Sequence, residues 1–337
     1  MVEAAKPGRN VMSVSLGVSC GRQHWQTCLM EKGHVLELNS FVDPGAARTC
    51  LEHTCVLYPE PNIVVAAAIN TPFTRLVDLS HECFERVVSG NDALQDFLIA
   101  IGYSNVASYV APSVKFLSSV PLHRKLMRED LGTSDKLCAF AALLLQLRTS
   151  EATWPEMNFM FLEVDNDDWS VLIAEDGRVV NGMTSGVKTG KQFEEASKRA
   201  YWEGLNQELA GLMAIHHFDE IVVMGRLRDA FIERFADSYQ VYLFPYAQAE
   251  FQGFEAALGA ATVAEGLYGH GIAAEIVGQL QISGAISSFD DETDPRSFTD
   301  RGSALNFDRH LASMPASRRS QESNPFISPC ARGKAQS

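Results

Sequence analysis

The sequence lacks any segment that would place the protein in or across a membrane. Its most apolar runs, such as residues 139–145, are far shorter than the roughly 20 residues that a membrane-spanning helix needs. The N-terminal stretch MVEAAKPGRN contains no apolar segment typical of a signal peptide. We therefore expect a cytoplasmic protein with no membrane partner.

Cysteine patterns that build disulfide frameworks or metal sites are absent as well. The 7 cysteines are an odd number, are scattered along the chain and form no CxxC pair. This arrangement predicts reduced thiols, most of them buried. The histidines show no ligand spacing with the cysteines, so the sequence predicts no protein-built metal site.

Positive charge is scarce. The chain has 28 lysine and arginine residues against 42 aspartate and glutamate residues, which gives a formal net charge of -14. No basic surface dominates such a protein, and this argues against nucleic acid as a partner. A small anionic ligand is still compatible with it, because a local basic pocket can form within an acidic protein.

The chain does have enough length and apolar content for two globular domains. It has 337 residues, of which 46% are hydrophobic and 21% are charged. From residue 283 the composition changes to Ser, Asp, Arg and Pro, without helical or strand periodicity. We expect domains at residues 11–150 and 151–282 and a disordered polar tail at residues 283–337.

The two halves of the chain repeat one order of predicted elements: strand, hairpin, helix, strand, helix, strand, helix. The hairpin turns are marked by Lys32-Gly33 and by Asp176-Gly177. The first half has elements at 11–19, 25–42, 45–54, 62–69, 91–101, 105–112 and after 133. The second half has them at 158–164, 169–183, 191–217, 219–225, 227–235, 240–245 and 253–269.

Each half predicts a mixed sheet, in which antiparallel strands are followed by parallel strands reached through helical crossovers. Two such halves that face each other over a cleft form the duplicated actin-like, or ribonuclease H-like, α/β fold. Residue identity between the halves is weak, so this prediction depends on the order of the elements.

The stretch GTSDK, residues 132–136, opens an almost uncharged helix and follows a cluster of charges at residues 123–130. One interpretation is a helix start, with Thr133 or Ser134 as the N-cap and Asp135 in the first turn, where the helix dipole favours it. The other is one wall of a polar cleft. The two interpretations are compatible.

Three segments are similar to a family described as predicted butyrate kinases, within the acetate and sugar kinase, heat-shock cognate and actin superfamily. They are PLHRKLMREDLGTSDKLCAFA (121–141), DEIVVMGRLRDAF (219–231) and GFEAALGAATVAEGLYGH (253–270), and the likeness extends over residues 11–282. The resemblance implies ATP and Mg²⁺ as cofactors and phosphoryl transfer to a small-molecule substrate, a carboxylic acid or a polyol. A homodimer is compatible with these features.

The resemblance also implies roles for individual residues. Asp135 becomes a general base on the acceptor oxygen, or a ligand to metal-bound water, with Lys136 beside it. The acceptor is held by Arg124, Lys125, Thr133 and Ser134, and the nucleotide by Gly17, Ser19, Glu163, Gly225, Arg226 and Gly259. From the residues alone, Gly225 and Arg226 also fit an ordinary strand-to-helix turn, and Gly259 also fits close helix packing.

The two phosphate-binding loops depart from the family's pattern. The family carries an Asp-Pro-Gly-Thr type loop after its first strand, whereas residues 15–19 here read SLGVS. The second loop, glycine-rich in the family, reads EVDNDD at residues 163–168, which fits divalent-cation ligands or an acidic solvated turn. Three functions therefore stay open: an ATP-dependent phosphotransferase, a catalytically inactive pseudokinase that acts as a regulatory or scaffold partner, and an actin-like assembly protein.

Overall fold

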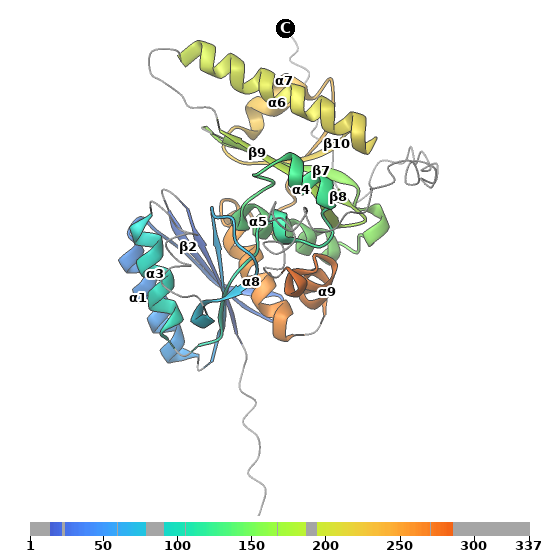
Figure 1. The fold of residues 1–337 in the computed structure, drawn as a ribbon. Helices are drawn as coiled ribbons and strands as arrows, with labels where there is room; N and C mark the ends of the chain where they lie inside the picture. The colour runs from blue at the N-terminus through green and yellow to red at the C-terminus, as the bar shows by residue number, and fades with distance from the viewer. Residues whose placement is uncertain are drawn as a thin grey trace, which may run out of the picture.

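The structure is a computed structural model that describes residues 14–21, 24–58, 60–78, 91–104, 106–166, 168–186, 194–269 and 271–285. In these residues the chain forms two mixed β-sheets with helices packed against them (Figure 1). The tail that we expect to be disordered lies outside the described residues from residue 286 onward. Among the described helices, none combines the length and the apolar character that a bilayer span requires.

The first sheet contains β1 (Ser15–Cys20), β2 (Trp25–Glu31), β3 (His34–Phe41), β4 (Asn62–Ala67), β5 (Thr74–Arg75) and β6 (Ser108–Val110). The strand order is β3-β2-β1-β4-β6-β5. Strand β1 is antiparallel to β2 and parallel to β4, and every residue of β1 and β4 is buried. Both residues of the β2–β3 turn, Lys32 and Gly33, have positive φ, as a tight two-residue hairpin requires.

The second sheet contains β7 (Phe159–Val164), β8 (Asp168–Glu175), β9 (Arg178–Gly186), β10 (Glu220–Met224) and β11 (Gln240–Leu243). Its strand order is β11-β10-β7-β8-β9. Strand β7 is antiparallel to β8 and parallel to β10, so it occupies the place that β1 has in the first sheet. Asp176 and Gly177 of the β8–β9 turn also have positive φ.

Four helices cover the outer faces of the sheets. Helices α1 (Pro44–Leu57) and α3 (Asp92–Gly102) pack on the first sheet, and α6 (Glu194–His216) and α7 (Arg228–Phe235) pack on the second (Figure 1). The side chain of Asn91 caps α3, as the sequence predicts. Each pair of helices connects parallel strands of its own sheet, so the crossovers repeat along with the strands.

The strand order, strand directions and crossover helices therefore match between the halves. The five strands β3-β2-β1-β4-β6 correspond to β9-β8-β7-β10-β11. This is the duplicated actin-like, or ribonuclease H-like, α/β fold, and the prediction of fold class is confirmed. Two helices, α4 (Leu122–Met127) and α9 (Ile272–Gln279), were not predicted.

Of the described helices, α5 (Ser134–Thr149) and α8 (Glu255–Tyr268) lie between the sheets (Figure 1). Each packs against the sheet of the other half. The ring of Phe140 in α5 lies 5.8 Å from that of Phe161 in β7, and α8 lies against β1 at Gly17. Residues of both sheets and both helices share one core. The division into domains at residues 11–150 and 151–282 stays a prediction, because this exchange links the halves.

Two glycines permit the close approach of these inner elements. A Cβ at Gly259 in α8 would overlap the backbone carbonyl of Cys138 in α5, and a Cβ at Gly17 in β1 would overlap the backbone of Ala257 in α8. Backbone cannot move aside as the end of a flexible side chain can. Both positions therefore require glycine for packing.

Substitution of Gly259 by alanine tests this contact. We expect Gly259→Ala to lower the free energy of unfolding by at least about 2 kcal/mol, because α5 and α8 must separate to admit the methyl group. The matched control is Gly211→Ala in α6, where a Cβ meets no atom within 4 Å. The control should raise stability by about 0.5–1 kcal/mol. Urea unfolding of both variants measures the difference, and equal stabilities would contradict the packing described.

Candidate functional site

A polar cleft of about 540 Å³ lies where the carboxyl ends of two parallel strands from each sheet meet. The residues that directly follow β1, β4, β7 and β10 all line it, and these are Gly21, Ala68, Asp165 and Gly225. The carboxyl edge of a parallel sheet is where ligands bind in open α/β folds. The volume is in the range of small-molecule sites. The duplicated fold thus brings two such edges to one cleft.

Two helices of the inner layer begin at the cleft. Thr133, Asp135 and Lys136 from the start of α5 line it, and so do Glu255 and Ala256 from the start of α8. A helix N-terminus carries partial positive charge from its unpaired amide groups, which favours an anionic ligand. At these two helix ends, backbone amide groups could donate hydrogen bonds to phosphate oxygens.

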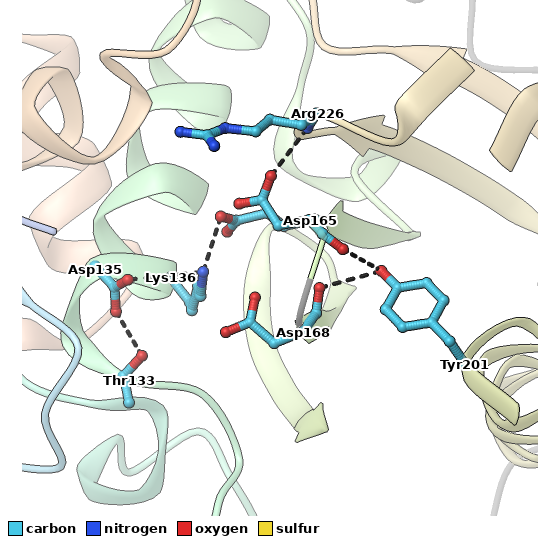
Figure 2. Close-up of polar contacts among 8 residues, drawn as sticks. Thr133, Asp135, Lys136, Asp165, Asp168, Tyr201 and Arg226 are labelled. Atoms are coloured by element: carbon cyan, nitrogen blue, oxygen red, sulfur yellow. Dashed lines mark hydrogen bonds and ion pairs between the residues drawn. The ribbon is translucent and has the colours of Figure 1, made fainter. Parts of the chain in front are cut away.

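The start of α5 has an unusual cap. Thr133 is the N-cap residue, as predicted, but its side chain makes no hydrogen bond to the helix backbone. Its hydroxyl instead donates to Oδ1 of Asp135 at 2.5 Å (Figure 2). The bond fixes the orientation of the Asp135 carboxylate, which is a first-turn acid favoured by the helix dipole. Thr133 and Asp135 therefore belong both to the start of the helix and to the wall of the polar cleft, which are the two interpretations of the GTSDK stretch.

Lys136 joins α5 to the second sheet. Its Nζ lies 2.8 Å from Oε1 of Glu163 in β7 and 3.7 Å from Oδ2 of Asp135. Burial lowers the pKa of Lys136, but the charges of Glu163 and Asp135 outweigh this, so the pKa lies above its ordinary value. Burial raises the pKa of Glu163 to about 7, with Lys136 opposing this and Asp135 adding to it. The ammonium group is therefore held between two carboxylates.

The β7–β8 turn forms the wall opposite α5. The amide of Asp165 donates to the carbonyl of Asp168 at 2.9 Å, and the hydroxyl of Tyr201 in α6 donates to both of their carbonyls, at 2.8 and 3.1 Å (Figure 2). The Asp165 carboxylate accepts from the amide of Arg226 at 3.0 Å. The turn is thus held from α6 and from the β10–α7 connection. Asp165 and Asp168 therefore line the cleft with their backbone bonded to neighbouring elements.

The start of α8 is tied to the β1–β2 hairpin. Glu255, which is only 7% exposed, accepts hydrogen bonds from the amide of Gly253 at 2.9 Å and from the hydroxyl of Tyr246. The side chain of Gln26 in β2 donates to the carbonyl of Gly253 at 2.7 Å. Gly253 has a φ of 88° and open space where a Cβ would project. The cleft is widened at this glycine.

The structure brings seven of the predicted site residues together. They are Ser19, Thr133, Asp135, Lys136, Glu163, Gly225 and Arg226, all of which line the cleft. They come from both halves of the chain. Their assignment to a nucleotide or an acceptor stays a prediction.

The other five predicted site residues lie outside the lining of the cleft. Gly17 and Gly259 are covered by helix backbone, so close packing explains why both residues are glycine. Ser134 is fully buried, and its amide donates to the carbonyl of Ile69 at 3.2 Å. Arg124 and Lys125 lie on α4, away from the cleft.

The Arg124 side chain bonds to a strand of the second sheet. Its Nη1 donates to the carbonyl of Val180 in β9 at 3.0 Å. Burial lowers the pKa of Arg124, and the charge of Glu175 opposes this. Arg124 thus packs against β9 in this structure, and its role in holding an acceptor stays a prediction.

Several residues of the cleft were not predicted from the sequence. They are His24, Gln26, Asp130, Thr184, Arg228, Tyr246, Gly253 and Glu255. Asp130 was within the charged stretch before GTSDK, so its neighbourhood in sequence was a usable signal. The start of α8 gave none, because nothing local shows that Glu255 faces Gln26 across the fold.

The cleft is acidic. Among the described residues that line it, Asp130, Asp135, Glu163, Asp165, Asp168 and Glu255 carry carboxylates, and Lys136, Arg226 and Arg228 carry strong cations. The described residues contain no group of three or more His, Cys, Asp or Glu side chains arranged to hold a metal ion. Mg²⁺ commonly takes one or two carboxylates together with waters and substrate phosphates. Asp135, Asp165 and Asp168 fit a cation that arrives with a nucleotide, and the helix N-termini fit its phosphates.

A family model with the description "Protein of unknown function (DUF1464)" matches residues 56–197. No curated protein matches the chain.

Solved structures with similar folds include three kinases, at low identity. Acetate kinase from Entamoeba histolytica is 8% identical over 67% of this chain and 87% of its own, with a TM-score of 0.45. Polyphosphate/ATP-glucomannokinase from Arthrobacter is 12% identical over 75% of this chain and 98% of its own, with a TM-score of 0.43. Propionate kinase from Francisella tularensis is 8% identical over 74% of this chain and 98% of its own, with a TM-score of 0.45.

The raised pKa of Glu163 predicts a dependence of stability on pH. Between pH 4.5 and about 7 the folded state binds more protons at Glu163 than the unfolded state, so stability falls as the pH rises through this window. We expect this contribution to be roughly 2–3 kcal/mol and to vanish in Glu163→Gln.

Urea unfolding at several pH values measures the contribution as the difference between wild type and variant. Glu129→Gln is the control, because Glu129 is exposed and does not line the cleft. It should keep the wild-type slope. Parallel slopes for all three proteins would contradict the buried, proton-binding state of Glu163.

Proposed function

We propose that the protein binds a magnesium–nucleoside triphosphate in the cleft and transfers the γ-phosphoryl group to a small carboxylic acid or polyol. The arrangement of Thr133, Asp135 and Lys136 at the junction of the two sheets is the observation that supports this most. It places an oriented carboxylate and a cation at the start of a helix, facing a turn that can share a divalent cation. Resemblance to the predicted butyrate kinases at residues 121–141 points to the same residues.

In this proposal the adenosine lies against the backbone at Gly225, beside Arg226, and the phosphates lie between the β1–β2 and β7–β8 hairpins. A magnesium ion bound with the nucleotide neutralises charge on its phosphates. The amide groups at the starts of α5 and α8 and the ammonium group of Lys136 stabilise the remaining charge. Thr133 holds Asp135 in position for the acceptor.

The proposed transfer balances without a further reactant. Asp135 accepts the proton of the acceptor hydroxyl as the acceptor oxygen bonds to the γ-phosphorus. The bond from the γ-phosphorus to the β–γ bridging oxygen breaks at the same time. The products are a phosphorylated acceptor and a nucleoside diphosphate, and the proton passes from Asp135 to solvent. An acceptor that is already a carboxylate needs no proton removal.

A second candidate is a pseudokinase that binds a partner or a nucleotide without turnover. Two observations favour it. The described residues of the β1–β2 side of the cleft, Ser19, Gly21, His24 and Gln26, include no carboxylate to orient Mg²⁺. Lys136 is already paired with Glu163, so a nucleotide must compete for it. In this case the fold serves as a regulatory or scaffold module.

Replacement of Asp135 separates the two candidates. We expect Mg·ATP to bind with measurable heat in isothermal titration calorimetry, and Asp135→Asn to lower kcat by about 10²–10⁴-fold while affinity for Mg·ATP changes little. The matched control is Asp92→Asn, since Asp92 is also an acid in the first turn of its helix, α3, and does not line the cleft. It should leave kcat unchanged.

Three other outcomes of these measurements would favour the pseudokinase or contradict the proposal. Binding of Mg·ATP without nucleoside diphosphate release supports the pseudokinase. A turnover rate that Asp135→Asn leaves unchanged contradicts the role of Asp135. The absence of any heat with millimolar Mg·ATP contradicts the nucleotide proposal as a whole.

A further inference from the structure

The cleft lacks the basic residues that were expected to hold an acidic acceptor. Arg124 is bonded to Val180 in β9, and neither Arg124 nor Lys125 lines the cleft. Among the cations that do line it in the described part of the chain, Lys136 is engaged by Glu163 and Asp135. The two arginines of the lining follow β10, on the side that we assign to the nucleotide.

The part of the cleft that would bind the acceptor contains a carboxylate, whereas an acidic acceptor would require a cation there. Asp130 lines the cleft directly before the GTSDK stretch, and its Oδ1 accepts from the amide of Gly132 at 3.1 Å. Burial raises the pKa of Asp130, and the charge of the neighbouring Asp135 adds to this, while the Gly132 amide, the charge of Lys136 and the Thr184 hydroxyl oppose it. Like charge is thus already crowded at this end of the cleft, beside the hydroxyl groups of Thr133 and Thr184.

We propose that the acceptor is a hydroxyl compound that is neutral or positively charged, a polyol or an amino alcohol, and that monocarboxylates are excluded. The inference rests on the proposed phosphotransferase function and chooses between its two acceptor classes. A carboxylate placed next to Asp135 meets Asp130, and Lys136, the cation of the described lining nearest to both, is already engaged by Glu163 and Asp135. This repulsion is strong in a partly buried site. A hydroxyl can donate to either carboxylate, and an ammonium group gains from both.

The acceptor of this class requires a base, which the structure supplies. Its hydroxyl proton goes to Asp135 as its oxygen bonds to the γ-phosphorus, and the nucleoside diphosphate leaves. Thr133 orients Asp135 from one side, and Nζ of Lys136 lies 3.7 Å from its Oδ2 on the other. A carboxylate acceptor would make such a base unnecessary.

A panel of acceptors tests the inference on the full chain. Glycerol, glucose, ethanolamine, acetate and butyrate are each supplied at equal concentration with Mg·ATP, and nucleoside diphosphate release is followed. We expect at least one hydroxyl compound to raise the rate tenfold or more over the rate in water. Acetate and butyrate should leave the rate at background.

The variant Asp130→Asn tests the cause. Removal of this charge should raise the rate with butyrate, or the affinity for it, by roughly fivefold to tenfold relative to wild type. Glu129→Gln removes a charge at the adjacent exposed position, outside the cleft lining, and should leave the selectivity unchanged. A circular dichroism spectrum and melting temperature establish that both variants are folded.

The failures are distinguishable. Turnover with acetate or butyrate that exceeds turnover with every hydroxyl compound overturns the acceptor class and leaves the phosphotransferase function intact. Calorimetry that shows no binding of Mg·ATP overturns the proposed function itself. Binding of Mg·ATP without release in the presence of any acceptor overturns the inference and supports the pseudokinase.

Discussion

The backbone contact between α5 and α8 is the constraint on which the rest of the structure depends. Gly259 lets α8 approach Cys138 in α5, and Gly17 lets β1 approach α8, so the two inner helices pack closely together and share one core with both sheets. Each helix packs on the sheet of the other half. The cleft is consequently fixed by the core: the starts of both helices and the carboxyl edges of both sheets must meet there.

This geometry also explains the electrostatics of the cleft. Fixed helix N-termini favour negative charge, and Asp135 and Glu255 occupy the first turns at these ends. Lys136 is then drawn between Asp135 and Glu163, which joins α5 to the second sheet by an ion pair that is mostly shielded from water. The excess of carboxylates over cations suits a divalent cation and disfavours a further anion. We therefore propose that the cleft discriminates between substrates by their charge.

The sequence predicts the fold more fully than the site, for a physical reason. Strand runs, hairpin turns and helix caps are local signals, and their repetition along the chain reveals the duplication. Site membership depends on contacts between distant segments. Gly17 and Gly259 satisfy close packing by the same lack of a side chain that would suit a phosphate. Arg124 bonds to Val180, and no local pattern shows this. Asp130 was in the correct stretch but was not recognised as a wall of the cleft.

A crystal structure of the full chain with Mg²⁺ and a non-hydrolysable ATP analogue tests the central claim most directly. The account predicts the nucleotide in the cleft, with its base against Gly225, its phosphates between the two hairpins, and its terminal phosphate facing Asp135. Loss of nucleotide density in crystals grown with the analogue in large excess, or a nucleotide bound elsewhere on the molecule, would contradict it.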